Sequence, residues 1–166
     1  GADEEAPQEP RRRGFWAVRS CVVAFGIAAG ASDGTARWQN VGQTVYYSLS
    51  PAMAGVCEGG SPKGLKWFAG ADTAPIYAYL LTSDDIGVHT LAGTAGLAAG
   101  SERFLIGPYV SMGILLSGVG LRASWLPFET RNGRRQGFEM RFTWLLSSTT
   151  SVQGMLLYAF RLHRLR

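Results

Sequence analysis

Large apolar residues occupy every second position on both sides of a turn signal between Val119 and Leu146, and this pattern constrains the fold most. Alternation with a period of two is typical of a β-strand whose two faces meet different surroundings. Asn132-Gly133 lies between the two alternating runs, and this dipeptide favours a two-residue hairpin turn. The segment therefore predicts an antiparallel hairpin. A turn centred on the dipeptide gives the pairs Pro127–Phe138, Trp125–Met140 and Ala123–Phe142.

The two faces of this hairpin differ in their chemistry. One face carries Trp, Phe, Met and Leu side chains, whereas the other carries Arg122, Glu139 and Arg141 among small residues. In a soluble β-sandwich the charged face would meet water and the apolar face would form the core. In an outer-membrane barrel the apolar face meets lipid and the charges point inward. The hairpin is compatible with both arrangements.

The composition favours a membrane barrel over a helical membrane protein. The chain has 166 residues, enough for one domain. Charged residues make up only 17% of it, against about 25% in soluble domains. The mean hydropathy of +0.04 is low for a helical membrane protein. Barrels have such middling values because only alternate residues face lipid.

The rest of the chain divides into a tail and further strands. Residues 1–13 are acidic, then basic, and contain prolines but no apolar run, so we expect a disordered tail. Their composition would suit the start of a mature, exported protein. Outside the hairpin, apolar or alternating segments predict strands at 15–31, 45–57, 67–81, 86–98, 104–116 and 152–162. About eight strands would make the smallest closed transmembrane barrel.

Aromatic residues gather at the ends of these strands. If the first strand runs up from the periplasm, the lower end holds Phe15, Trp16, Trp67, Phe104, Trp125, Phe128 and Phe138, and the upper end holds Tyr47, Tyr77, Tyr79 and Trp144. Lipid interfaces select two such girdles, because an amphipathic ring prefers headgroup depth. The residues that we expect at the lipid interface are Trp16, Trp67, Trp125, Phe128, Phe138 and Trp144.

In these features residues 14–162 resemble the small eight-stranded outer-membrane barrels, the class of the OmpA and OmpX transmembrane domains. The resemblance is architectural and rests on no motif. It implies a β-barrel over residues 14–166 in a Gram-negative outer membrane, surrounded by lipid and lipopolysaccharide, with residues 1–13 as a flexible periplasmic tail. Long outer loops are usual in the class, but only the 32–44 loop is long here. This difference argues against an adhesin or receptor role.

The charged face predicts a polar network inside the barrel. Its expected members are Asp72, His89, Arg122, Glu139, Arg141 and Gln153. These residues could form a gated polar path or a binding site, or they could form a paired network that fills the barrel, because buried charges need partners. Eight strands leave an interior just wide enough for side chains, so we favour the filled network.

The chain has two cysteines, Cys21 and Cys57. If the 32–44 loop is centred near Gln39, the two residues fall directly opposite each other near the lower rim. They could form a disulfide, as cysteines in exported proteins often do, although a direct cross-strand disulfide demands a narrow geometry. The sequence contains no cluster of His or Cys ligands, so we expect no metal, and it indicates no cofactor.

We do not expect catalysis from this sequence. His89 and His163 are its two histidines, and neither has a serine and a carboxylate at a recognisable spacing. The hypothesis is therefore a structural or partner-binding subunit of the bacterial envelope, with other envelope proteins as candidate partners. The alternatives are a narrow pore or transport barrel, a lipid A-modifying barrel enzyme, and a soluble lipid-binding barrel.

Two structural alternatives and one further partner stay open. Residues 104–121 carry no charge and meet the length rule for a membrane-spanning helix, although Pro108 and several glycines argue against it. A soluble lipid-binding barrel would place Trp125, Phe142 and Trp144 inside and the charges in water. The net charge of +4 could attract acidic headgroups. The basic residues are not interleaved with an aromatic platform, so nucleic-acid binding is not expected.

Overall fold

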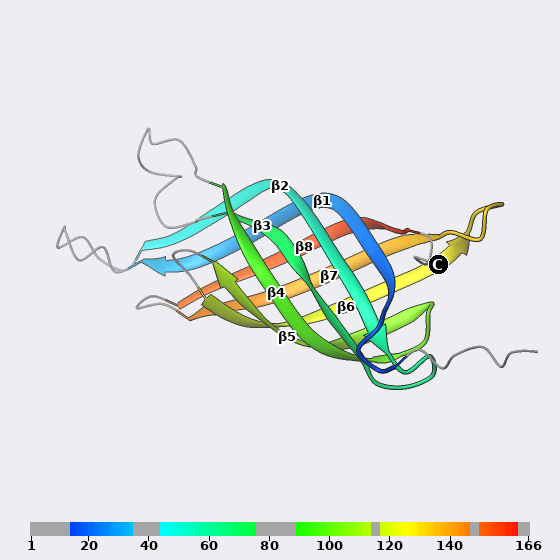
Figure 1. Cartoon of the computed structure of the whole chain (residues 1–166). Helices are drawn as coiled ribbons and strands as arrows, with labels where there is room; N and C mark the ends of the chain where they lie inside the picture. Colours follow the sequence, from blue (N-terminus) through cyan, green and yellow to red (C-terminus); the bar gives the residue numbers. More distant parts are fainter. Residues whose placement is uncertain (1–13, 35–43, 76–88, 114–116, 147–149, 163–166) are drawn as a thin grey trace, which may run out of the picture.

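The computed structural model describes residues 14–34, 44–75, 89–113, 117–146 and 150–162, which form an all-β fold (Figure 1). The strands are β1 (Val18–Gly34), β2 (Thr44–Gly60), β3 (Lys66–Pro75), β4 (His89–Gly100), β5 (Phe104–Gly113), β6 (Ser117–Glu129), β7 (Arg135–Leu146) and β8 (Thr150–Arg161). Each strand pairs antiparallel with its neighbours in sequence, and β8 pairs with β1 to close a barrel. The predicted closed, antiparallel barrel of eight strands is confirmed. The predicted tail, residues 1–13, lies outside the described residues.

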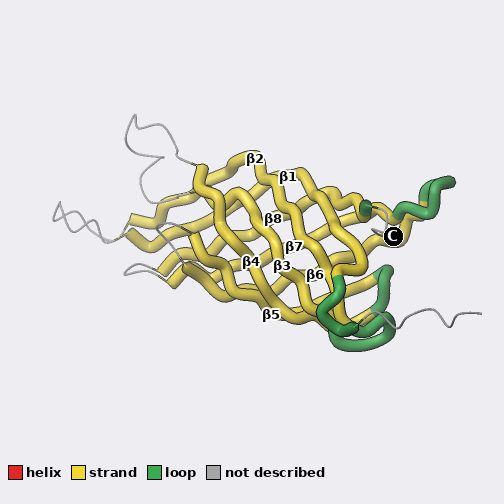
Figure 2. The backbone as a smooth tube through the Cα atoms, in the orientation of Figure 1, coloured by secondary structure: helices red, strands yellow, loops and turns green. Residues whose placement is uncertain are grey.

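One end of the barrel, which we call the terminal end, holds the start of β1 and the end of β8 (Figure 1). The turns at 61–65, 101–103 and 130–134 lie at this end and are green in Figure 2. Each turn is closed by a backbone hydrogen bond. The N–O distances are 2.9 Å from Ser61 to Leu65, 2.8 Å from Ser101 to Phe104 and 2.8 Å from Thr130 to Arg134. The connections at the opposite end fall outside the described residues.

Side chains alternate between the interior and the exterior of the barrel. On β7, Glu139 and Arg141 are buried, whereas Phe142 and Trp144 are 52% and 53% exposed. The same alternation runs along β5 and β6. The charged face of the β6–β7 hairpin therefore lies inside and its apolar face lies outside. This is the opposite of the arrangement that a soluble barrel with Trp125, Phe142 and Trp144 inside would require.

The register of the β6–β7 hairpin differs by two residues from the prediction. Trp125 pairs with Phe138 rather than with Met140, and Ala123 pairs with Met140 rather than with Phe142. The predicted pairs are therefore wrong. The division into faces is nevertheless correct, because a shift of two residues keeps every side chain on its own side of the sheet.

A longer loop and a β-bulge each account for one residue of this shift: Glu129 pairs with Arg135 next to the loop, one residue from the predicted register, and the bulge adds the second residue. β6 has two residues, Leu126 and Pro127, where β7 has only Gly137. Proline has no N–H for the hydrogen-bond ladder, so a bulge accommodates it. The hairpin loop then spans residues 130–134 instead of two residues, and its only positive φ in the described structure is the 71° of Gly133.

Two glycines make room for aromatic rings inside the barrel. The rings of Phe68 and Tyr109 are buried, with centroids 6.4 Å apart. A Cβ atom at Gly96 would lie 2.6 Å from Cζ of Phe68, and one at Gly120 would lie 2.8 Å from Cε1 of Tyr109. Both distances are shorter than carbon atoms tolerate, so these two positions need a residue without a side chain.

No helix in the described ranges is long and apolar enough to cross a membrane. The described part of residues 104–121 consists of β5 and the start of β6. The helical alternative for this segment is therefore wrong. Pro108 is exposed on β5 and pairs with Leu121 of β6.

Candidate functional site inside the barrel

Six charged side chains form one ion-pair network inside the barrel. Successive residues of a β-strand point to opposite faces, so each strand can present every second residue to the interior. Five strands contribute at such positions. The members of the ion-pair network are Glu58 on β2, Asp72 on β3, Arg122 on β6, Glu139 and Arg141 on β7, and Arg161 on β8.

The ion-pair network begins near the terminal end with Glu58. Its two carboxylate oxygens accept hydrogen bonds from Arg161 Nη2 and Arg122 Nη1, each at 3.0 Å. Arg122 then donates from Nη2 to Oε2 of Glu139 at 2.7 Å. Arg161 also donates from Nη1 to the backbone oxygen of Glu102 at 3.1 Å, which ties β8 to the turn at 101–103.

The network continues toward the middle of the barrel through Arg141. Nε of Arg141 donates to Oε1 of Glu139 at 2.7 Å. Nη1 of Arg141 donates to Oδ2 of Asp72 at 2.9 Å. Both oxygens of Glu139 are therefore used, one by each arginine.

Burial and pairing together indicate a structural role for this network. Arg122 is 2% exposed and Glu139 is 0% exposed. Unpaired charges at such depth would be very costly, but three arginines and three carboxylates balance one another. Arg122 also lies over the ring of Phe68, 4.6 Å from its centroid, which adds a cation–π contact. The network thus fills and crosslinks the interior.

A few polar atoms of the network have no partner in the part of the chain that the structure describes. Oδ1 of Asp72, Nη2 of Arg141 and Nε of Arg122 are buried without a hydrogen bond to any described residue. A second polar contact joins the hydroxyls of Tyr109 and Thr143 inside the barrel. Buried polar atoms of this kind are ordinarily satisfied by bound water.

The structure brings together four of the six residues that were expected in the polar network: Asp72, Arg122, Glu139 and Arg141. Gln153 is buried on β8, but its Nε2 has no partner among the described residues, so it stands apart from the ion pairs. His89 begins β4, and its side chain lies outside the described part of the structure.

Glu58 and Arg161 were not among the residues expected in the polar network. Glu58 lies just past the predicted strand at 45–57, and glycines, a serine and a proline follow it, but β2 continues to Gly60. Arg161 lies between Phe160 and Leu162, both exposed, so the alternation of β8 already points it inward. The signal for Glu58 was a continuation of the strand by a few residues, whereas Arg161 already lay within the predicted strand at 152–162.

Aromatic residues form clusters on the exterior near the terminal end. The rings of Trp125 and Phe138 stack with centroids 6.4 Å apart, and Phe138 meets Tyr158 edge to face at 5.4 Å. The ring centroids of Trp16 and Trp67 lie 6.5 Å apart, and Nε1 of Trp67 donates to the backbone oxygen of Phe15. Of the residues expected at a lipid interface, Trp67 is half-buried, and the exposed ones are Trp16, Trp125, Phe128, Phe138 and Trp144. The side chains of Tyr47, Tyr77 and Tyr79 lie outside the described residues.

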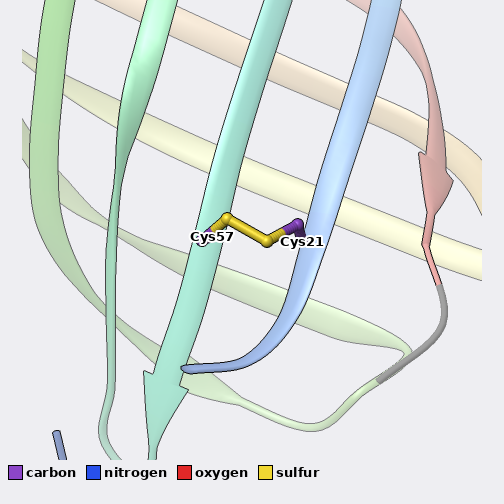
Figure 3. The surroundings of a disulfide bond; sticks show 2 residues. All are labelled: Cys21 and Cys57. Atoms are coloured by element: carbon purple, nitrogen blue, oxygen red, sulfur yellow. A yellow bond between two sulfur atoms is a disulfide. The ribbon is translucent and has the colours of Figure 1, made fainter. Parts of the chain in front are cut away.

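A disulfide joins Cys21 of β1 to Cys57 of β2 (Figure 3). The two residues are direct partners in the register of these strands. Their neighbours Val22 and Val56 are buried, so alternation places the disulfide on the outer face of the barrel.

The described residues contain no group of three or more potential metal ligands. No protein-family model matches the chain, and neither the curated proteins nor the solved structures contain a match.

Proposed function

We propose that this protein is an outer-membrane β-barrel that acts as a structural or partner-binding subunit of a bacterial envelope, without catalysis. The observation that carries the proposal is that charged side chains lie inside and large apolar side chains lie outside, the reverse of the distribution in a soluble protein. Arg122 and Glu139 are buried inside the barrel, while Phe142 and Trp144 on the outer face are half exposed. A barrel of this kind is stable only if hydrocarbon covers its exterior.

The dimensions and the cysteine chemistry support this placement. Strands β5 to β8 are 10 to 13 residues long. A tilted strand needs about 9–11 residues to cross the hydrocarbon of a bilayer. The disulfide between Cys21 and Cys57 favours an oxidising compartment such as the periplasm and the surfaces that adjoin it. We place the terminal end, and with it residues 1–13, on the periplasmic side.

The ion-pair network favours a structural role over a pore or an enzyme. Arg122 and Glu139 sit in the middle of the network and use their charged groups on each other and on Glu58 and Arg141. A conducting path would need these ion pairs to separate, which is costly in a medium of low polarity. A lipid A-modifying enzyme would need an acid or base free to exchange protons with its substrate.

Planar-bilayer recordings test the structural role against the pore alternative. Single molecules of the inserted protein should show no stable conductance step, because the ion-pair network fills the interior. A conductance that changes in Arg122→Gln would favour the pore instead. The partner-binding role is tested in cells by deleting residues 1–13 and substituting the exposed turns. If every interaction with envelope proteins then persisted, that role would be wrong.

A further inference from the structure

The terminal end of the barrel carries a ring of basic side chains, which we call the basic rim. It comprises Lys63, Arg103, Arg131 and Arg134, one or two from each of the three turns at this end. All four side chains are exposed, and none has a carboxylate partner among the described residues. Of the acidic residues nearby, Glu58 is buried with Arg161, Glu129 is paired with Arg135, and Glu102 is exposed next to Arg103. The four cations outnumber this one exposed carboxylate, so the basic rim carries a net positive charge.

Backbone contacts hold two of these turns close to each other. Leu126 of β6, just before the 130–134 turn, donates its N–H to the backbone oxygen of Arg103 at 2.7 Å. Arg161 of β8 binds the backbone oxygen of Glu102 in the same turn. The positive charges of Arg103 and of the 130–134 turn thus belong to one surface, and the 130–134 turn projects outward at this end (Figure 1).

The basic rim lies immediately beyond exposed aromatic side chains. Phe104 follows Arg103 directly and is 46% exposed. Phe128 lies three residues before Arg131 and is 51% exposed. Three residues of extended chain span about 10 Å. Aromatic rings prefer the depth of the headgroups, so the guanidinium and ammonium groups would reach the phosphates. Arginine binds phosphate oxygens with two parallel N–H groups.

We propose that the basic rim binds the phosphate groups of anionic phospholipids in the leaflet at the terminal end. This inference rests on the membrane placement proposed above. The partner is identified by charge complementarity, because four exposed cations at headgroup depth match an anionic leaflet and not a zwitterionic one. An acidic protein segment would match the charge as well, but it would not explain why the charges directly adjoin outward-facing aromatic residues.

Fluorescence quenching by brominated lipids tests the proposal. The full chain is folded into phosphatidylcholine vesicles that contain a minor fraction of either brominated phosphatidylglycerol or brominated phosphatidylcholine. Trp16, Trp67 and Trp125 lie at the terminal end and report on lipids there. At low salt the anionic lipid should quench several-fold more efficiently than the neutral one. This preference should fall in 1 M salt, where the Debye length is about 3 Å.

Charge variants separate the basic rim from other sources of attraction. The variant Lys63→Gln, Arg103→Gln, Arg131→Gln, Arg134→Gln should lose most of the preference, whereas Arg103→Lys, Arg131→Lys, Arg134→Lys should keep it. A preference that survives in the glutamine variant would overturn the proposal, and so would equal quenching by both lipids in the unaltered protein. Both results leave the membrane placement intact. Failure of the unaltered chain to enter pure phosphatidylcholine vesicles would instead contradict the proposed function, and the lipid site with it.

Discussion

Arg122 and Arg141 are direct cross-strand partners on the interior face of β6 and β7, and the carboxylate of Glu139 binds both of them at 2.7 Å. Like charges directly opposite each other on a sheet are destabilising. Glu139 lies on the same face of β7, two residues before Arg141. Each of its two carboxylate oxygens binds one of the two guanidinium groups. Each arginine has one further partner, Glu58 for Arg122 and Asp72 for Arg141, but Glu139 is the carboxylate that bridges the two strands at this pair.

Replacing Glu139 tests this bridge. Glu139→Gln keeps the shape of the side chain but leaves two buried arginines facing each other without a shared counter-charge. We expect a loss of about 3–5 kcal/mol in the free energy of unfolding, the range for breaking a buried ion pair. Urea titration of the folded protein in detergent or vesicles measures it.

The matched control for this variant is Glu129→Gln at the terminal end. Glu129 pairs with Arg135 at 3.3 Å, and its side chain is 53% exposed. Exposed pairs contribute about 0–1 kcal/mol, so this variant should unfold almost like the unaltered protein. Equal effects of the two substitutions would mean that the interior charges do not hold the barrel together.

Removing the disulfide should weaken the barrel without abolishing its fold. Cys21 and Cys57 are separated by 36 residues in sequence. A crosslink over a loop of this length restricts the unfolded chain and stabilises the native state by about 2–4 kcal/mol. Cys21→Ser, Cys57→Ser should therefore unfold at lower urea concentration. Alkylation of the unaltered, unfolded protein should modify both cysteines only after reduction, and a thiol that reacts without reductant would contradict the disulfide.

Gly120→Ala should destabilise the interior by overpacking. The added Cβ would clash with the backbone oxygen of Phe142 and would lie 2.8 Å from Cε1 and Cζ of Tyr109, so both the backbone and the ring must move. We expect a cost of about 1–3 kcal/mol in urea titration. Gly55→Ala is the control, because a Cβ at Gly55 meets no described atom within 4 Å. If both variants behaved alike, the tight packing of Tyr109 over β6 would be incorrect.

A charged side chain on the exterior should lower the stability of the folded protein, and the loss should grow with the depth of the residue in the membrane. Phe142→Arg places a cation on the outer face of β7, near the middle of the strand, and should destabilise the protein in vesicles by about 2–4 kcal/mol. Phe128→Arg places the same cation near the terminal end and should cost about 0–1 kcal/mol. Equilibrium folding into vesicles measures both. A smaller cost at Phe142 than at Phe128 would argue against hydrocarbon around β7.

The alternation in the sequence was sufficient to predict the barrel and the direction of its faces. Arg122 and Arg141 are buried because they occupy the phase opposite to Trp125 and Phe142, which any shift by two residues preserves. The pairing of individual residues was less accessible, because the 130–134 loop and the bulge at Leu126 and Pro127 together move the register by two residues, which leaves the alternation unchanged. Asn132-Gly133 does lie in the turn, but within a loop of residues 130–134 rather than as a two-residue turn.

The partners within the interior could not be read from the sequence. Alternation indicates that Asp72 and Arg141 point inward, but they lie on β3 and β7, which are not adjacent in the barrel. Their contact at 2.9 Å depends on barrel closure and on side-chain length across the interior. Glu58 was not predicted to lie inside for a simpler reason. β2 continues into the glycine-rich sequence that was expected to end the strand.

The central claim is that hydrocarbon surrounds the apolar exterior of this barrel, and folding into lipid vesicles followed by electrophoresis without and with boiling tests it most directly. We expect the protein to float with the vesicles after a carbonate wash, and the unboiled band to migrate differently from the boiled one. A chain that stays in the aqueous fraction, with one mobility under both conditions, would contradict this claim.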